Sequence, residues 1–144
     1  MPDVRTVPFA PAHLRSMRIQ PRQRTFLDFV PAELAEQLAD KPSITVIDGE
    51  EPLLCGGVIE MWPGRALCWA YFAEGIRERM IAVVRAARRF IQDNAPARLE
   101  MDVERDHEEG HRLAPLLGFR LETECMPNYY PNGNAASLYV RIRV

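Results

Sequence analysis

Apolar residues recur along the chain with two spacings, one typical of strands and the other typical of helices. Alternating or continuous apolar runs predict strands at residues 4–9, 44–47, 53–62, 66–72, 99–104, 119–125 and 136–143. Helices are predicted at residues 12–18, 31–39, 76–93 and 107–117. In the third helix Ile76, Met80, Val83 and Ala87 recur at helical spacing, so this side should pack on a sheet.

Turn-forming residues separate these elements, and proline and glycine add detail to two of them. Pro31 stands at a favourable position in the first turn of its helix, and Gly56-Gly57 predicts a bulge or a close approach of two backbones. Apolar residues alternate with Glu100, Asp102 and Glu104 in the strand at 99–104. We therefore expect one face of this strand to be solvated and acidic.

Length and composition limit the class of protein. A chain of 144 residues has the size of one domain, here residues 1–144, and 47% hydrophobic with 26% charged residues is typical of a globular protein. No apolar run approaches the roughly 18 to 20 residues of a membrane span, and the first residues lack the apolar centre of a secretory signal. A cytoplasmic location is expected. Three cysteines without Cys-x-x-Cys spacing favour neither a disulfide framework nor a cysteine zinc site.

The charge of the chain is nearly balanced. A formal net charge of -2 and a pI near 5.9 predict neither a nucleic-acid partner nor an anionic membrane surface as a partner. Of the 18 basic residues, 17 are arginine and only Lys41 is lysine. Two explanations compete for this bias: a GC-rich genome, or a site that needs guanidinium groups for phosphate or carboxylate.

The segment from Val103 to Phe119 carries the most specific pattern of the chain, a strand followed by a helix that ends in Leu117-Gly118-Phe119. Together with the order of elements, this segment resembles the Gcn5-related N-acetyltransferase (GNAT) superfamily over nearly the whole chain. The resemblance implies a GNAT-like α/β (α+β) fold with a mixed, mainly antiparallel sheet of about seven strands and four helices. Leu14 to Arg18 ahead of Asp28, with a short loop before the long helix, is particularly similar to GNAT-like proteins of tailed bacteriophages.

This resemblance implies that acetyl-CoA binds where the long helix begins. The pantetheine arm would run along the strand at 69–72, past Trp69, and the pyrophosphate would lie on backbone amides of the turn at 73–77. The residues implied as cofactor-binding are Tyr71, Phe72, Ala73, Gly75, Ile76, Arg77 and Arg79. The family's loop, Gln/Arg-x-x-Gly-x-Gly/Ala, is degenerate here, because Ala70 and Ala73 stand at its first two positions and Glu74 adds a negative charge.

The catalytic residues implied by the resemblance are also altered. Ala114 stands where many GNAT enzymes have the tyrosine that protonates the leaving thiolate, and His107 stands at a common asparagine. Tyr129 or Tyr130 is a candidate to replace that tyrosine, and Glu60 or Tyr71 is a candidate base.

Two functional classes follow, with a third as a minor alternative. The first is a phage-related GNAT-fold protein without catalysis, which binds a protein partner or serves in virion assembly in the host cytoplasm. The second is an N-acyltransferase that moves an acetyl group from acetyl-CoA to an amine. The third is a zinc hydrolase, because His107, Glu108 and His111 satisfy the pattern His-Glu-x-x-His. Gly110 and Pro115 oppose this last interpretation, since neither residue favours a helix interior, and no metal ligand set is predicted.

Overall fold

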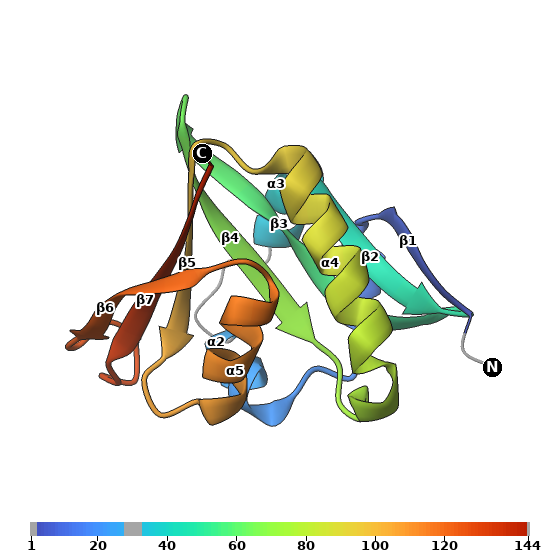
Figure 1. Ribbon diagram of the computed structural model, residues 1–144. Coiled ribbons are helices and arrows are strands. Elements are labelled where there is room, and N and C mark those ends of the chain that lie inside the picture. The colour runs from blue at the N-terminus through green and yellow to red at the C-terminus, as the bar shows by residue number, and fades with distance from the viewer. Residues whose placement is uncertain (1–2, 28–32, 144) are drawn as a thin grey trace. The chain divides into compact units, whose positions relative to one another are not determined.

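The computed structural model describes residues 3–27 and 33–143 (Figure 1). Its strands form one sheet in the order β1-β2-β3-β4-β5-β7-β6. The strands are β1 (Val4–Pro8), β2 (Ser43–Asp48), β3 (Glu51–Trp62), β4 (Arg65–Phe72), β5 (Arg98–Glu104), β6 (Arg120–Met126) and β7 (Ala136–Ile142). The helices are α1 (Pro11–Ser16), α2 (Pro21–Leu27), α3 (Leu34–Ala39), the 3-10 turn η1 (Arg77–Arg79), α4 (Met80–Asn94) and α5 (Glu108–Leu116). The mixed, mainly antiparallel sheet of seven strands is confirmed.

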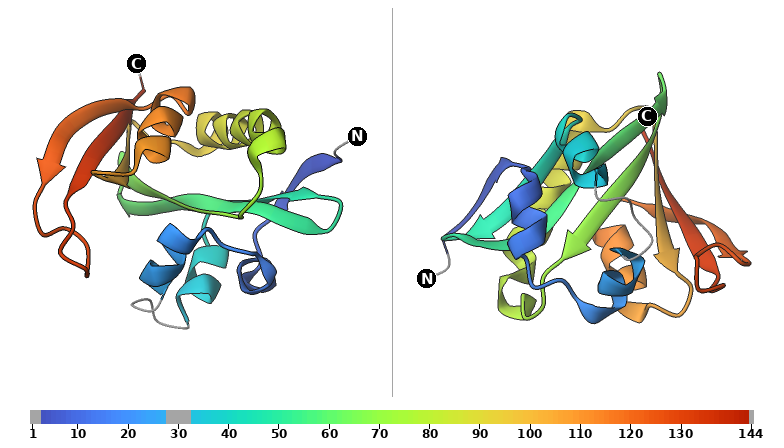
Figure 2. Two further views of the ribbon diagram at one scale, coloured as in Figure 1. Left: turned by 90° about the horizontal axis from the view of Figure 1, so that it is seen from below. Right: turned by 180° about the vertical axis from the view of Figure 1, so that it is seen from behind.

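The chain divides into two compact units, residues 1–59 with 69–94 and residues 60–68 with 95–144. In the first unit β1 pairs antiparallel with β2, and β2 pairs antiparallel with β3. The helix α4 lies on one face of these strands, and α1, α2 and α3 lie on the opposite face (Figure 2). Val83, Ala87 and Ile91 form the buried side of α4, which agrees with the predicted helical spacing.

The close approach predicted at Gly56-Gly57 is confirmed. A Cβ atom on Gly57 would lie 2.6 Å from the carbonyl oxygen of Pro42 and 2.8 Å from Nε1 of Trp69. Because no side chain fits in this space, glycine lets β3 pass between the segment before β2 and the Trp69 ring.

The helix α2 is missing from the predicted elements, so the expectation of four helices is wrong. Within the described residues there are five α-helices, and α2 begins with Pro21, after the helix predicted at residues 12–18. Proline is favoured in the first turn of a helix because its missing N–H group has no intrahelical partner there. Pro31 and Asp28 lie outside the described residues, and α3 begins at Leu34.

In the second unit β4 and β5 pair in parallel, with Arg65 opposite Arg98 and Leu67 opposite Glu100. The strand β7 pairs antiparallel with both β5 and β6, and α5 packs against β5. No helix among the described residues has the length and apolar character needed to cross a membrane.

The acidic face of β5 is only partly the solvated surface that the alternation predicted, since Asp102 alone of its three acidic residues is exposed. Glu100 and Glu104 are buried, at 6% and 7% exposure. Glu100 accepts hydrogen bonds from Arg65 and Arg98, and Glu104 accepts one from Asn134. The prediction is wrong for these two residues because arginine and amide groups cover their carboxylates, which alternation alone does not indicate.

Candidate functional site

The turn between β4 and α4 is built from backbone hydrogen bonds to two other segments of the first unit. The N–H of Ala73 donates to the carbonyl of Leu53 at 2.9 Å, and the N–H of Glu74 donates to the carbonyl of Arg18 at 2.7 Å. Gly75 then adopts a φ of 70°. Residues with a Cβ atom rarely adopt this left-handed conformation, so glycine allows the chain to turn sharply into the helix.

Where this turn becomes a helix, several backbone amides lack a hydrogen-bond partner among the described residues. The first intrahelical acceptors lie at Ile76 and Arg77, whose carbonyls bind the N–H groups of Arg79 and Met80. The N–H groups of residues 75–78 precede the helical ladder, and they donate no hydrogen bond to any described residue. Such unpaired N–H groups at a helix start, together with the positive end of the helix dipole, favour an anion.

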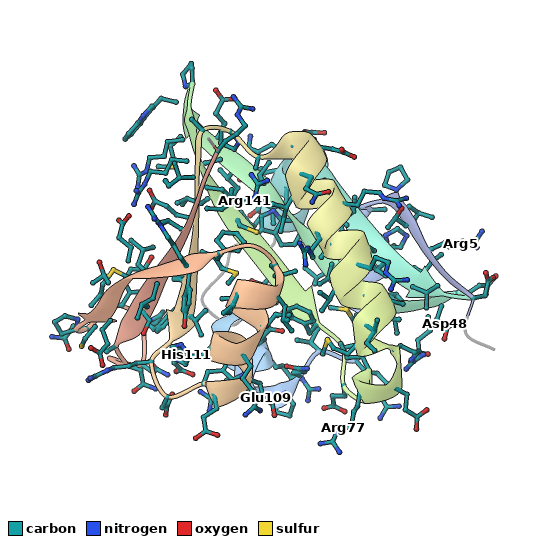
Figure 3. All side chains as sticks on the ribbon, viewed as in Figure 1. Arg5, Asp48, Arg77, Glu109, His111 and Arg141 are labelled. Atoms are coloured by element: carbon teal, nitrogen blue, oxygen red, sulfur yellow. The ribbon has the colours of Figure 1, made fainter. Side chains whose placement is uncertain are left out.

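The two arginines predicted to bind phosphate have different environments. Arg77 is exposed and, among the described residues, forms no ion pair; it projects outward from the turn (Figure 3). Arg79 instead lies 3.1 Å from Asp48 Oδ2 and 2.7 Å from Glu51 Oε2, and it donates to the carbonyl of Gly75 at 3.2 Å. Arg79 therefore holds the turn in place, and Arg77 is the arginine that is free to meet a ligand.

The negative charge that Glu74 adds to the turn is offset by two arginines from the N-terminal segment. Its carboxylate lies 3.7 Å from Arg18 Nη2 and 3.4 Å from Arg24 Nη2. Arg24 also donates to the carbonyl of Ile19, which fixes its direction. The turn thus carries less net negative charge than its sequence indicates, although such exposed pairs are individually weak.

The end of β4 carries a second set of polar contacts. Because Ala73 faces β3 with its N–H, the N–H of Phe72 and the carbonyl of Ala70 lie on the edge of β4 that faces away from β3. The side chain of Gln23 on α2 binds both groups: its Nε2 donates to Ala70 at 2.8 Å, and its Oε1 accepts from Phe72 at 2.7 Å. The rings of Trp69 and Tyr71 lie 6.1 Å apart on one face of β4.

The candidate proton donors lie in the second unit. The rings of Tyr129 and Tyr130 meet edge to face with their centroids 5.0 Å apart, and the Tyr130 hydroxyl donates to Asp102 Oδ2 at 2.6 Å. Burial, followed by the nearby Asp102 carboxylate, raises the pKa of Tyr130, and burial raises that of Tyr129. Glu60 is exposed, and Ala114 is fully buried in α5.

The segment from His107 to His111 does not form the zinc site of the minor alternative. The helix α5 begins at Glu108, so His107 precedes it and the two histidines are not on successive turns of one helix. Nε2 of His111 donates to the carbonyl of Arg105 at 2.8 Å, while the Tyr139 hydroxyl donates to Nδ1 at 2.8 Å. Over residues 3–27 and 33–143, no group of three or more His, Cys, Asp or Glu side chains is arranged to hold a metal ion.

The cofactor-binding residues predicted from the sequence all belong to the first unit, and the turn brings Gly75, Ile76 and Arg77 together. Sequence reasoning missed Gln23, and it missed the two arginines that pair with Glu74. The excess of arginine in residues 1–24 was a signal that this segment meets acidic groups, but it did not show which ones. No comparable signal marked Gln23.

Comparisons with known proteins support the fold. The sequence matches no protein-family model, and it matches no curated protein sequence. Ard1 from Thermoplasma volcanium has a similar structure, with 17% identity, a TM-score of 0.77 and 98% of each chain covered. An IAA acetyltransferase from Bacillus cereus has 13% identity and a TM-score of 0.69, over 98% of this chain and 100% of its own.

A third similar structure comes from Bacillus anthracis and is described as an acetyltransferase of the GNAT family. It has 9% identity and a TM-score of 0.70, over 96% of this chain and 94% of its own. At such identities the likeness concerns the fold alone. With the sheet order and the helices described above, these matches show that the chain has the fold of the GNAT acetyltransferases.

Proposed function

We propose that this protein is an N-acetyltransferase that binds acetyl-CoA at the turn after β4 and transfers the acetyl group to an amine. The observation that carries the proposal is the set of unpaired N–H groups at residues 75–78, next to the exposed guanidinium of Arg77. An anion such as a pyrophosphate suits this combination of amides, helix dipole and fork-shaped cation. The similar structures that are described as acetyltransferases support the choice of cofactor.

The residues of the turn fit the group that the fold implies. Gly75 adds no side chain over the amides, since a Cβ atom there would meet nothing within 4 Å, and Arg18 and Arg24 offset the charge of Glu74. Arg77 and the amides of residues 75–78 would hold the pyrophosphate. Arg79 positions Gly75 through the hydrogen bond to its carbonyl oxygen. When bound, acetyl-CoA supplies a thioester whose carbonyl carbon an amine can attack, with CoA leaving as the thiol.

The protein's own part in that reaction is to bind, orient and move protons. Ala114 has no proton to give, so Tyr130 and Tyr129 remain the proposed donors and Glu60 the proposed base. Both phenols are protonated at neutral pH at their ordinary pKa, and burial raises the pKa of each further. The hydrogen bond from Tyr130 to Asp102 fixes the direction of its hydroxyl.

The alternative is a GNAT-fold protein that binds a protein partner without catalysis, with the proposed phage origin and host cytoplasm as its context. Ala114 favours this alternative, because the position lacks any group able to transfer a proton. Gene neighbourhood is the observation that tests the phage origin, since capsid or tail genes on both sides would support it.

Calorimetry with acetyl-CoA tests the enzyme proposal. We expect wild type to bind one acetyl-CoA per chain, and Arg77→Ala to bind it roughly tenfold more weakly because a charge-assisted contact is lost. Arg88→Ala is the matched control, since Arg88 is an exposed arginine elsewhere on α4, and its affinity should equal that of wild type.

Release of free thiol in the presence of a panel of amines then tests catalysis. The panel includes peptide N-termini, polyamines and small primary amines. Absence of heat at millimolar acetyl-CoA would exclude the proposal, whereas binding without thiol release for any amine would favour the non-catalytic alternative.

A further inference from the structure

The edge of β4 that faces away from β3 holds backbone groups that an extended ligand could use. Phe72 offers an N–H donor and Ala70 a carbonyl acceptor, and both belong to the half of β4 that lies in the first unit. Near the start of β4, at residues 65–67, the pairing partner is β5. At residues 70–72 the partner is instead the side chain of Gln23, which comes from a segment 47 residues away in sequence from Ala70.

The side chain of Gln23 carries the same hydrogen-bonding groups as a ligand that contains an amide. A primary carboxamide places one donor and one acceptor side by side, and Gln23 uses both of them at 2.8 and 2.7 Å. An extended ligand that contains amides would offer the same two groups to a strand edge, as peptides do when they add a strand to a sheet. The pairing is only partly buried, so solvent and ligands can reach it.

Neighbouring contacts hold the segment before α2 against β4 without the side chain of Gln23. The preceding residue Gln20 uses its backbone N–H on the carbonyl of Phe72 at 2.9 Å, and Ile19 forms a bridge with Ala73. These backbone contacts fix the segment before α2 against the strand. The Gln23 side chain can therefore rotate away without detaching that segment.

We propose that Gln23 is a displaceable stand-in for a ligand amide on the edge of β4, and that an amide-containing arm such as that of acetyl-CoA binds by replacing it. This inference rests on the proposed function, since it names how the same cofactor engages the strand. Binding then includes the cost of breaking two hydrogen bonds, each with a modest net contribution. Gln23 therefore lowers the affinity for acetyl-CoA and leaves unchanged the affinity for a diphosphate that has no amide.

The test compares two probes, acetyl-CoA and ADP, on purified full-length protein by calorimetry. We expect Gln23→Ala to bind acetyl-CoA roughly tenfold more tightly than wild type and to bind ADP equally. Gln37→Ala is the matched control, because Gln37 is an exposed glutamine on α3, and both of its affinities should equal those of wild type. Gln23→Met, which has a similar length and loses both the donor and the acceptor, is a second variant in case Gln23→Ala does not fold, and it should also bind acetyl-CoA more tightly.

Nuclear magnetic resonance gives a readout that does not depend on a variant. The side-chain NH2 signals of Gln23 should move when acetyl-CoA is added and stay in place when ADP is added. If wild type binds acetyl-CoA while these signals stay in place, the displacement of Gln23 is excluded and the proposed function is retained. The same holds if Gln23→Ala binds acetyl-CoA no more tightly than wild type. If neither wild type nor Gln23→Ala binds acetyl-CoA, the proposed function and the stand-in both fail.

Discussion

At the scale of single residues, the conformation of Gly75 decides the shape of the proposed phosphate turn. We expect Gly75→Ala to lower the free energy of unfolding by about 1–2 kcal/mol, because alanine is strained at a φ of 70°. Gly49→Ala is a matched control, since Gly49 has a φ of 62° and equally open surroundings. Urea denaturation should show a similar loss for both variants, whereas calorimetry should show weaker acetyl-CoA binding for Gly75→Ala only. Equal acetyl-CoA affinity in the two variants would contradict the binding of acetyl-CoA at this turn.

Residue roles were only partly predictable from the sequence. Glycine before a long helix indicated the turn at Gly75, because few other residues adopt its conformation. The sequence did not predict that Arg79 is paired while Arg77 is exposed, since Asp48 and Glu51 approach Arg79 from distant strands. Gln23 could not be found at all, because a polar side chain on a short helix gives no periodic signal.

At the scale of elements, the buried carboxylate of Glu100 on β5 binds Arg65 of β4 and Arg98 of its own strand. The hydrogen bond from Arg65, followed by that from Arg98, lowers the pKa of Glu100 to about 2 from its usual 4.5, against the opposing effect of burial. Since the folded pKa lies below the unfolded one, this carboxylate stabilises the fold above pH 4.5. That stabilisation is lost as the pH falls from about 4.5 toward 2.

We therefore expect Glu100→Gln to lower the free energy of unfolding at pH 7 by roughly 2 kcal/mol, since two guanidinium groups lose their shared partner. The difference from wild type should shrink as the pH falls toward 2, which urea denaturation over a pH series measures. Glu122→Gln provides the comparison, because Glu122 also pairs with Arg98 but its side chain is 39% exposed. A difference that stayed constant down to pH 2 would contradict the assignment to Glu100.

The elements themselves were largely predictable where the apolar pattern was long. Each predicted strand and the long helix α4 are confirmed, because alternation and helical spacing reflect which side is buried. The helix α2 was missed because Pro21-Arg22-Gln23-Arg24 has no apolar periodicity, and its contacts with β4 form through polar groups. Two acidic residues of β5 were wrongly assigned to solvent, because alternation does not show that Arg65 of β4 and Asn134 approach them.

At the scale of the whole molecule, binding of acetyl-CoA should stabilise the native state in proportion to its concentration. A ligand at about 100 times its Kd adds about 2.7 kcal/mol when it binds only the folded chain. We expect Tm to rise steadily with the logarithm of the acetyl-CoA concentration, as differential scanning fluorimetry measures. Arg77→Ala should shift this rise to higher concentrations, and a Tm that is independent of acetyl-CoA would contradict binding.

The fold is shared with acetyltransferases at 9 to 17% identity, over 94% or more of each chain compared. The order of elements made this fold predictable, because seven strands and a long helix between the fourth and fifth strands are visible as a pattern. The acceptor was not predictable, because a fold does not determine the substrate. Ala114 and Glu74 are two of the positions where the sequence departs from the pattern that the resemblance to the GNAT superfamily implies.

The contacts of residues 18–24 with the end of β4 have a consequence for how the chain can be shortened or varied. Arg18, Gln20 and Gln23 together satisfy backbone groups from Ala70 to Glu74. Removal of this segment would leave a strand terminus with bare polar groups, and such an edge recruits other chains. We therefore expect a chain that lacks this segment to self-associate.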